Sequence, residues 1–396
     1  MAAEPPKEKY SELLNAYLEK MRTIIFTLAG VCLLLLVVYD VYATILHARG
    51  RSGPIGETLN RSVWLVVRTI AFRLSRPRRH KLLNFVGPLL LPLLIILFIV
   101  LLIAGFALIY YPRMPAAFNI DPEAASPAWI EALYFSGITL TTVGYGDIAP
   151  RTVEMRLLAL VESTSGFALI SLAVTYLVTV YGALERKRAV ALSFYHQAEE
   201  GADVAGFISH HFVEGSFYGL EAALRMATRD IQELLESHVE HPVIHYFHPV
   251  EIYKSLPRVL FLVLETCAVI RSCLDSDTYA ETCNHPEVRS LEASARHVLR
   301  ELYVSLDLEK RPARREETPF EEVHRWEQRY KQTMRRLNKA GIVTRRDVER
   351  GWEQYRAQRE EWESTLQRFA AYLGYEWDEV TGDRDLRYAA DEEMEK

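Results

Sequence analysis

The 396-residue sequence contains only four cysteines, and none of them stands in a Cys-x-x-Cys pair. A disulfide framework is therefore not expected, and free thiols suit a reducing cytoplasm. The sequence also lacks a Gly-x-Gly-x-x-Gly turn after an expected strand and the Gly-x-x-x-x-Gly-Lys-Ser/Thr phosphate loop. These absences argue against a βαβ nucleotide-binding domain and against a P-loop. The net charge of −6 is mild, so nucleic acid is not an expected partner.

Charge is missing from three long stretches of the chain. Residues 23–39, 82–111 and 163–184 contain no Asp, Glu, Lys or Arg. With the apolar residues that flank them, each is long enough to cross ~30 Å of hydrocarbon at about 1.5 Å per residue. Residues 185–396 are rich in charge and have helical periodicity. The expected fold class is therefore an all-α membrane protein with an all-helical cytoplasmic domain.

The segment before residue 82 is expected to hold one span and one basic region. Residues 1–21 form an amphipathic segment without a cleavage site, so the span over 22–46 is interpreted as a retained anchor. Asp40 lies in this span and should face protein or the headgroup region. Residues 47–81 are basic, and their apolar part, 61–75, is short and interrupted by arginines. This favours a cytoplasmic or interfacial helix over a fourth span, which stays open as the alternative.

Three arginines in the basic region recur at every third residue, as in a voltage sensor. They are Arg73, Arg76 and Arg79. Pro77 is expected to break the helix between the last two, and no apolar residues surround the end of the run. A cluster of positive charge on the cytoplasmic side is the simpler interpretation.

A seven-residue motif stands between two helical segments. It reads Thr141-Thr142-Val143-Gly144-Tyr145-Gly146-Asp147. A helix predicted over 127–140, too short to span the membrane, precedes it, and the last span, over 152–184, follows it. The arrangement resembles the tetrameric pore-loop potassium channel family of the bacterial, two-helix type, whose TVGYG loops replace the hydration shell of K⁺ with carbonyl oxygens. The resemblance covers 82–184, with an outer helix over 82–111 and the filter over 141–147.

The resemblance implies a role for each filter residue. The carbonyls of Thr142, Val143, Gly144 and Tyr145, together with the Thr142 hydroxyl, would bind K⁺, which is the transported ion and not a cofactor. Gly144 and Gly146 can adopt left-handed dihedrals at no steric cost, as a strand with all its carbonyls on one side requires. Tyr145 would brace this strand against the pore helix.

Thr141 begins the filter, and Asp147 would lie at its outer mouth. Each chain has one such motif, so four chains are needed to close the ring, and a homotetramer in a lipid bilayer is expected. Conduction is passive. Neither catalytic residues nor enzyme activity are therefore expected.

Two residues of the inner helix are candidates for a role in gating. Gly166 occupies the place where this family commonly carries a hinge glycine, and close packing against another helix is the alternative explanation. Glu162 lies one turn earlier, near the expected base of the filter. An ionisable side chain at that depth is a functional candidate, either paired with the pore-helix region or adding negative potential to the cavity.

Residues 185–396 begin with a basic cluster over 185–188, which indicates that the C-terminus is cytoplasmic. The resemblance to the bacterial type implies a multi-pass protein of a bacterial inner membrane. The apolar stretch 259–274 predicts a buried core helix and not a span. Two later helices, 320–339 and one ending near 373, are expected to form an antiparallel hairpin or, alternatively, a coiled-coil seam between subunits. Thr344 and Asp347 resemble a capping box between these two helices.

Four histidines recur at spacings of three and four residues. They are His238, His241, His245 and His248. This spacing would place imidazoles on one helical face for metal binding or pH sensing. Pro242 and Pro249 interrupt the segment, which favours a structural or solvated cluster instead.

The sequence therefore predicts a potassium-selective channel, gated through its inner helix by the cytoplasmic domain. A non-selective cation channel is one alternative. A membrane receptor or scaffold whose helical domain is the output is another. An unidentified regulatory ligand on the cytoplasmic domain is left open, because nothing in the sequence indicates the gating stimulus.

Overall fold

The computed structural model describes residues 7–47, 53–114, 116–120, 126–197, 204–310 and 320–382. Parts of the predicted N-terminal segment, of the basic region, of the loop before the pore helix and of the cytoplasmic domain lie outside these residues. The chain divides into two compact units. The first comprises Met1–Leu59 and Leu89–Thr179, and the second comprises Asn60–Pro88 and Val180–Lys396.

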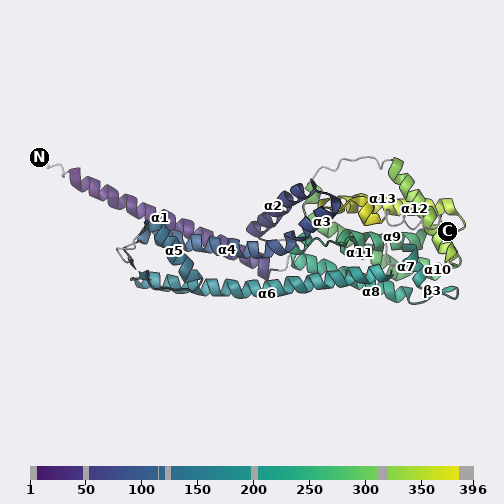
Figure 1. Cartoon of the computed structure of the whole chain (residues 1–396), viewed down its shortest axis with the longest axis horizontal. Coiled ribbons are helices and arrows are strands. Elements are labelled where there is room, and N and C mark those ends of the chain that lie inside the picture. The colour runs from purple at the N-terminus through teal and green to yellow at the C-terminus, as the bar shows by residue number, and fades with distance from the viewer. Residues whose placement is uncertain are drawn as a thin grey trace. The chain divides into compact units, whose positions relative to one another are not determined.

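Among the described residues, the two longest helices, α1 and α6, lie in the first half of the chain (Figure 1). Its elements are α1 (Lys7–Val41), the π-helix η1 (Tyr42–Leu46), α2 (Pro54–Ala71), α3 (Arg76–Asn84), α4 (Val86–Tyr110), the 3-10 turn η2 (Tyr111–Arg113), β1 (Phe118–Asn119), α5 (Ala128–Leu140), β2 (Ala149–Pro150) and α6 (Val153–Gln197). Helices α2, α4 and α6 contribute residues to both units.

The second half is also helical. Its elements are α7 (Val204–His210), β3 (Phe212–Val213), β4 (Ser216–Phe217), α8 (Leu220–Glu240), η3 (Pro242–Tyr246), η4 (Ile252–Lys254), α9 (Leu256–Ser272), α10 (Ala280–Cys283), α11 (Pro286–Ser305), η5 (Leu308–Lys310), α12 (Phe320–Lys339), α13 (Val348–Tyr372) and α14 (Trp377–Thr381). The strands form two short antiparallel pairs, β1 with β2 and β3 with β4.

Three helical segments in the described part of the chain are long and apolar enough to cross a membrane. They are Leu13–Leu46, Arg76–Arg113 and Val153–Phe194. They contain the three stretches in which the sequence lacks charge. Helix α2 carries the apolar part of the basic region and does not meet these criteria. The chain is therefore an all-α membrane protein with a helical domain.

Three helix boundaries differ from the prediction. Helix α1 joins the described part of the amphipathic segment to the first span without a break. It contains no proline, and Gly30 is its only glycine. Helix α6 continues to Gln197, 13 residues beyond position 184, since the basic cluster and the alanines after it also favour helix. Pro77 does not break a helix. It occupies the first turn of α3, where a missing N–H costs nothing.

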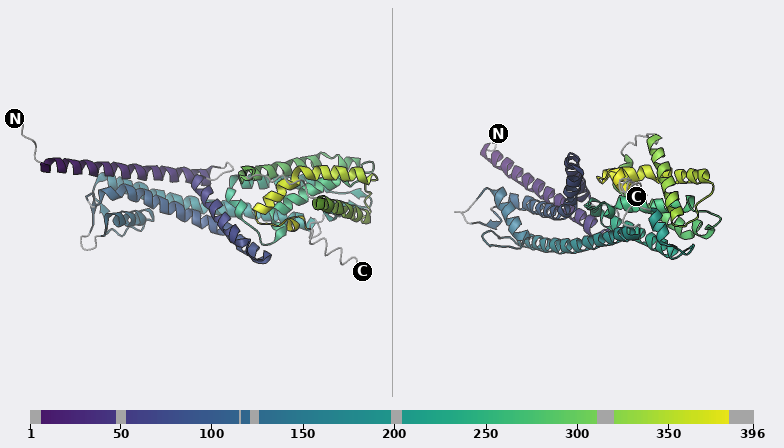
Figure 2. Two further views of the ribbon diagram at one scale, coloured as in Figure 1. Left: turned by 90° about the horizontal axis from the view of Figure 1, so that it is seen from above. Right: turned by 45° about the vertical axis from the view of Figure 1, so that its right-hand side comes forward.

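The first unit is built around α5, which lies between α4 and α6 (Figure 1). Tyr110 of α4 and Phe135 of α5 meet Phe118 of β1 in edge-to-face contacts with centroids 5.1–5.6 Å apart. Helix α1 runs alongside α4 (Figure 2, left), where Gly30 and Gly105 approach so closely that a Cβ on Gly30 would lie 2.5 Å from the Gly105 carbonyl oxygen. Small residues at a helix crossing allow this approach in a membrane.

The aspartate of the first span caps another helix. Asp40 is fully buried and accepts hydrogen bonds from the backbone N–H groups of Ile55 (2.5 Å) and Gly56 (3.1 Å) in the first turn of α2. Thr44 donates to the same carboxylate at 3.2 Å. The free N–H groups and positive end of a helix stabilise a carboxylate. Asp40 thus faces protein, which is one of the two environments that the sequence predicts for it.

The second unit is built around α9. All residues of α9 except Arg271 are buried, so the prediction of a core helix is confirmed. Its charged residues are paired, because the Arg258 guanidinium donates to the carbonyls of Glu379 and Val380, and Glu265 forms an ion pair with a residue of α13. Helices α7, α11, α13 and α14 pack around it.

Helices α12 and α13 pack against each other through aromatic contacts, as the hairpin interpretation expects. Tyr330 of α12 lies 5.3–5.9 Å from the ring centroids of Trp352 and Tyr355 on α13. The predicted capping box is wrong in detail. Asp347 is itself the N-cap of α13, and its side chain accepts from the Arg350 N–H at 3.0 Å, so Thr344 lies outside the helix start.

The segment that leads into α4 is tied to α14 by ion pairs within the second unit. Arg76 contacts Glu376 and Asp378, and Arg79 lies 2.7 Å from Glu376. Gly87, at the start of α4, is covered by Phe247, since a Cβ at position 87 would meet that ring at 2.5 Å. Residues of the second unit therefore contact the chain directly before the apolar part of α4.

Candidate functional site

The filter motif follows the C-terminus of α5 directly. The N–H groups of Val143 and Gly144 donate to the Ile138 carbonyl at 2.9 and 3.2 Å, which folds the strand back over the last turn of the helix. Thr142, Gly144 and Gly146 have positive φ values of 59°, 56° and 83°. Every second residue is therefore left-handed.

This alternation is the backbone geometry that the sequence led us to expect for Gly144 and Gly146. It extends to Thr142, a residue with a Cβ, at which a left-handed dihedral costs roughly 1–2 kcal/mol. Backbone strain of this size persists only where the surroundings enforce it, and it gathers at functional sites.

The outer end of the motif is held by the loops around it. Asp147 accepts a hydrogen bond from the phenol of Tyr134 in α5. β2, which follows the motif, pairs with β1 through Phe118 opposite Pro150. Sequence reasoning missed Tyr134, because a tyrosine 13 residues before an aspartate on an apolar helix carries no signal of its own.

The filter side chains are uncovered in a single chain. All residues from Thr141 to Asp147 are exposed, and Val143 and Tyr145 expose 52% and 74% of their surface. The strand therefore presents an apolar and an aromatic side chain that the described part of one chain leaves uncovered. A single chain does not test whether Tyr145 braces the strand.

Glu162 lies behind the pore helix. It is fully buried on α6, and its carboxylate accepts a hydrogen bond from the Tyr110 hydroxyl of α4 at 2.8 Å. The Ser136 hydroxyl of α5 contacts the other carboxylate oxygen and lies 3.0 Å from the Ile103 carbonyl. Glu162 therefore joins three helices, which corresponds to the pairing interpretation of its role. Sequence reasoning did not find Tyr110 and Ser136.

Gly166 of α6 lies against the end of α5. A Cβ at this position would lie 2.0 Å from the carbonyl oxygen of Leu140, the last residue of α5. No real Cβ tolerates such a contact, so close packing accounts for the glycine. The residue that the sequence marked as a hinge candidate thus supports the base of the filter strand.

Comparison with known proteins places this geometry in a family. A family model described as an ion channel matches residues 95–182. The chain is similar to the potassium channel protein kcv of Paramecium bursaria Chlorella virus 1, with 34% identity over 83 residues that make up 84% of that protein and 20% of this chain. The chain belongs to the pore-loop potassium channel family. It is therefore a membrane protein whose residues 95–182 match an ion-channel family.

Two further relatives show how far the likeness to channels and membrane proteins extends. A human potassium voltage-gated channel, subfamily A member 7, is 35% identical over 80 residues, 20% of this chain and 15% of that protein. An uncharacterized membrane protein of Bacillus subtilis (strain 168), YdjJ, is 29% identical over 232 residues, 58% of this chain and 65% of that protein. The chain spans less than two thirds of either relative. No solved structure gives a significant match.

The four histidines of this channel do not share a helical face. His238 lies in α8 and His245 in η3, with the break at Pro242 between them, and all four are buried. Burial lowers the pKa of His245 to about 4 and that of His248 to about 3, so both are neutral at physiological pH. In the described part of the chain, no group of His, Cys, Asp and Glu could hold a metal ion.

His248 has a partner that sequence reasoning missed. Its Nε2 shares a hydrogen bond of 2.8 Å with Nδ1 of His80 in α3, and His80 Nε2 lies 3.1 Å from Glu379. Tyr375 stacks on the His248 ring at 4.3 Å. Along the chain, His248 lies 168 positions and Glu379 lies 299 positions from His80. No local spacing in the sequence could therefore have indicated the cluster.

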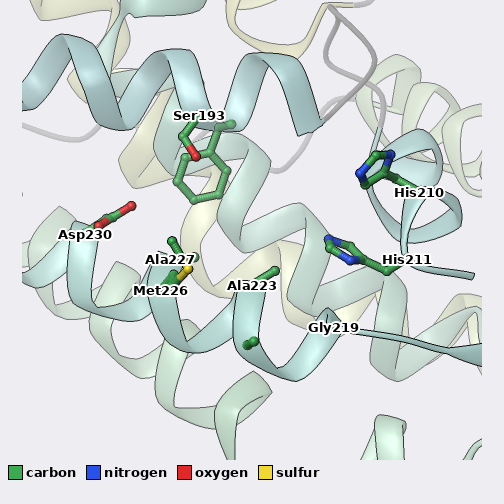
Figure 3. A pocket seen from close by; sticks show the side chains of 10 residues that line it. Ser193, His210, His211, Gly219, Ala223, Met226, Ala227 and Asp230 are labelled. Carbon is green, nitrogen blue, oxygen red and sulfur yellow. The ribbon is translucent and has the colours of Figure 1, made fainter.

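The second unit of the channel contains a hollow of about 280 Å³ beside the end of α6 (Figure 3). Ser193 of α6, His211 and the α8 residues Met226 and Asp230 line it. His211 Nδ1 lies 3.2 Å from the Tyr218 carbonyl. The hollow is just below the roughly 300–1,000 Å³ of typical ligand sites, and its polar groups are few.

Proposed function

We propose that four copies of this chain form a potassium-selective pore. In this pore, the carbonyls from Thr142 to Tyr145 and the Thr142 hydroxyl replace the water around K⁺. The observation that carries the proposal is the alternation of left-handed residues along TTVGYGD at the end of α5. Alternate left-handed residues turn successive carbonyls to one side, and four such strands would enclose stacked rings of oxygen atoms.

The exposed filter strand supports the tetramer. Val143 and Tyr145 are uncovered in one chain, and three further copies around the pore axis would cover them. The C-terminus of α5 would then aim its partial negative charge at the cavity below the filter, where it favours a cation.

The inner helix supports a role of the helical domain in gating. Helix α6 continues unbroken from Val153 to Gln197, so residues of the second unit belong to the same helix as the cavity wall. A ligand or modification that moves these residues would move the inner helix. Arg186 and Arg188 at the inner end of the span favour a cytoplasmic C-terminus in a multi-pass protein.

The decisive experiment is the reversal potential of purified full-length protein in liposomes under opposed K⁺ and Na⁺ gradients. We expect a potential close to the K⁺ equilibrium value. Equal permeability would make the protein a non-selective cation channel. If no current flows under any gradient, the protein would instead be interpreted as a membrane receptor or scaffold.

Gly144→Ala tests whether this strand is the filter, because a Cβ is strained at φ 56°. We expect loss of K⁺ flux with the tetramer intact on size-exclusion chromatography. Gly341→Ala is the matched control, since Gly341 has a φ of 81° in a turn of the second unit. It should keep both selectivity and flux. Undiminished flux in Gly144→Ala would contradict the assignment.

A further inference from the structure

The hollow beside the end of α6 has no part in the proposed pore. It has a volume of about 280 Å³ and lies within the second unit, between the end of α6 and one face of α8. Apolar side chains form most of its wall: Phe194 of α6 and Ala222, Ala223, Met226 and Ala227 of α8. An apolar cavity with a few placed polar groups is the usual form of a small-molecule site. The polar groups therefore indicate which kind of molecule it would take.

Asp230 brings a negative charge to this wall. Among the described residues no basic side chain forms an ion pair with it, since the neighbouring Arg229 lies 3.1 Å from Glu233 instead. Burial raises the pKa of Asp230, and the charge of Glu233 raises it further. A nearby cation would favour the charged form of this carboxyl group. None of the described residues that line the hollow is Lys or Arg, so the hollow favours a cationic ligand.

His211 also lines the hollow, and there it can only accept a hydrogen bond. Its Nδ1 lies 3.2 Å from the Tyr218 carbonyl, which is itself an acceptor, so Nδ1 carries the proton. Burial lowers the pKa of His211, which leaves the ring neutral at physiological pH and its Nε2 with a lone pair. Nε2 is buried and has no hydrogen-bond partner within the described part of the chain. A ligand group that meets this nitrogen must therefore be a donor.

These two polar groups are far apart. Asp230 lies seven residues after Ala223 on α8, a rise of about 10 Å at about 1.5 Å per residue. Figure 3 shows Asp230 and His211 at opposite ends of the hollow, with Met226 and Ala227 between them. One ammonium group cannot reach both ends. A ligand that satisfies both needs a cation at one end, a neutral donor at the other and an apolar body between them.

We propose that this hollow binds a small amphipathic amine, whose ammonium group pairs with Asp230 and whose hydroxyl or N–H group donates to Nε2 of His211. The apolar body would lie along the apolar face of α8. Phosphates and carboxylates do not fit, because both ends of the hollow present acceptors. The ligand would also contact Ser193 and Phe194, near the end of the helix that continues from the pore. An effect on gating rests on the proposed function, whereas binding does not.

The test is isothermal titration calorimetry of the full-length protein in a neutral detergent and potassium chloride, with three probes. Tyramine carries an ammonium group and a phenol at opposite ends of an apolar body. Phenethylamine lacks the phenol, and 3-(4-hydroxyphenyl)propionic acid has a carboxylate in place of the ammonium group. We expect saturable binding of tyramine, at least threefold weaker binding of phenethylamine and no binding of the acid. No saturable binding of tyramine, or equal binding of the acid, would overturn the proposal.

Asp230→Asn tests the cationic end of the site. It should weaken tyramine binding at least tenfold in a protein with unchanged or higher Tm, because it removes a charge that burial disfavours. Glu236→Gln is the matched control, since it removes the same charge from an exposed position of α8 that does not line the hollow. It should weaken binding less than threefold. Equal weakening by the two variants, or none by Asp230→Asn, would place the amine elsewhere and contradict the assignment.

His211→Phe tests the other end, because it keeps a ring but removes the acceptor. It should weaken tyramine binding to the level of phenethylamine and leave phenethylamine binding unchanged. If both probes weaken equally, the ring only fills space and Nε2 is not a ligand contact. Calorimetry requires no ion flux, so a failure of this site and a failure of the proposed pore are observed separately.

Discussion

At the scale of single residues, the contact between Gly166 and Leu140 determines how closely the inner helix approaches the base of the filter. Gly166→Ala would place a Cβ 2.0 Å from the backbone oxygen of Leu140. A backbone oxygen cannot move away by a change of side-chain rotamer. We expect a lower Tm, by the equivalent of roughly 1–3 kcal/mol, and reduced K⁺ flux, because α5 and α6 must separate.

Gly182→Ala is the control for this change on the same helix. A Cβ at Gly182 meets no atom within 4 Å, and alanine favours helix over glycine by about 1 kcal/mol. Its Tm should therefore stay equal or rise. Thermal unfolding followed by tryptophan fluorescence, together with liposome flux, compares the two variants. Similar losses in both would show that helix bending, and not close packing, matters along α6.

The hydrogen bonds of Glu162 are a second residue-scale feature that can be measured. Tyr110→Phe removes one donor, and Glu162→Gln weakens both contacts while keeping the volume. We expect each change to cost about 1–3 kcal/mol and the double variant to cost less than the sum, with a coupling of roughly 0.5–3 kcal/mol. Strictly additive unfolding energies would show that the 2.8 Å contact contributes nothing.

Sequence reasoning found one side of each of these contacts. Gly166 and Glu162 attracted attention because a glycine and a carboxylate are unusual in an apolar span. Their partners, Leu140 and Ser136, are ordinary residues of an apolar helix, and the same is true of Tyr134. A single sequence shows which residue is energetically unfavourable in an apolar span. The residue that offsets this cost depends on how a distant helix packs, which the sequence does not show.

At the scale of helices, a buried ionic network joins α9, α12 and α13. Arg359 is 1% exposed, lies 3.3 Å from Glu265 and donates to Glu363, and Trp326 donates to Glu363 at 2.8 Å. Arg359→Met would leave two carboxylates buried without their cation. We expect destabilisation of about 3–5 kcal/mol, visible as a Tm lower by at least about 6 °C.

Arg356→Met provides the comparison one turn away on the same helix. Arg356 forms an exposed i,i+4 pair with Glu360 at 2.8 Å, and such pairs are worth at most about 0.5 kcal/mol. Its Tm should change by less than about 2 °C. A small effect of Arg359→Met would mean that the network relaxes or admits water when its cation is removed.

Elements could be predicted where one local property decides them. The membrane spans could be predicted from the absence of charged residues. Helix α9 could be predicted from an apolar run that is too short to cross a membrane. The end of α6 was missed, because the transition from apolar to charged residues marks the edge of the membrane and not the end of a helix. The start of α13 was misplaced by three residues, since Thr344 and Asp347 are both good caps and only tertiary contacts choose between them.

At the scale of the whole molecule, the two units differ in what the sequence alone could reveal. Seven consecutive residues led to the prediction of a pore, because the proposed selection of K⁺ would need a particular backbone. The helical unit has no such motif, and its histidines became interpretable only with the packing in hand. Spacing along the chain suggested a shared helical face for them, whereas Pro242 ends that face and His80 completes the cluster from another segment.

These buried histidines predict that the stability of the whole protein falls in mild acid. Their pKa in the unfolded chain is about 6.5, whereas burial lowers the folded values of His245 to about 4 and of His248 to about 3. Below pH 6.5 the unfolded state therefore binds protons that the folded state does not. Stability is fully present above about pH 6.5 and decreases as the pH falls toward these folded values.

At pH 5 each such histidine should cost about 2 kcal/mol relative to pH 8. Thermal unfolding of the full-length protein in detergent between pH 8 and pH 5 measures this slope. His245→Asn should reduce this dependence of stability on pH by the contribution of one histidine, because the amide still reaches the Pro242 carbonyl but does not titrate. His324→Asn, at an exposed position of α12, should leave the slope unchanged. If His245→Asn keeps the full slope of the unmodified protein, the acid sensitivity arises from other groups, and the buried imidazoles do not govern how the helical unit responds to pH.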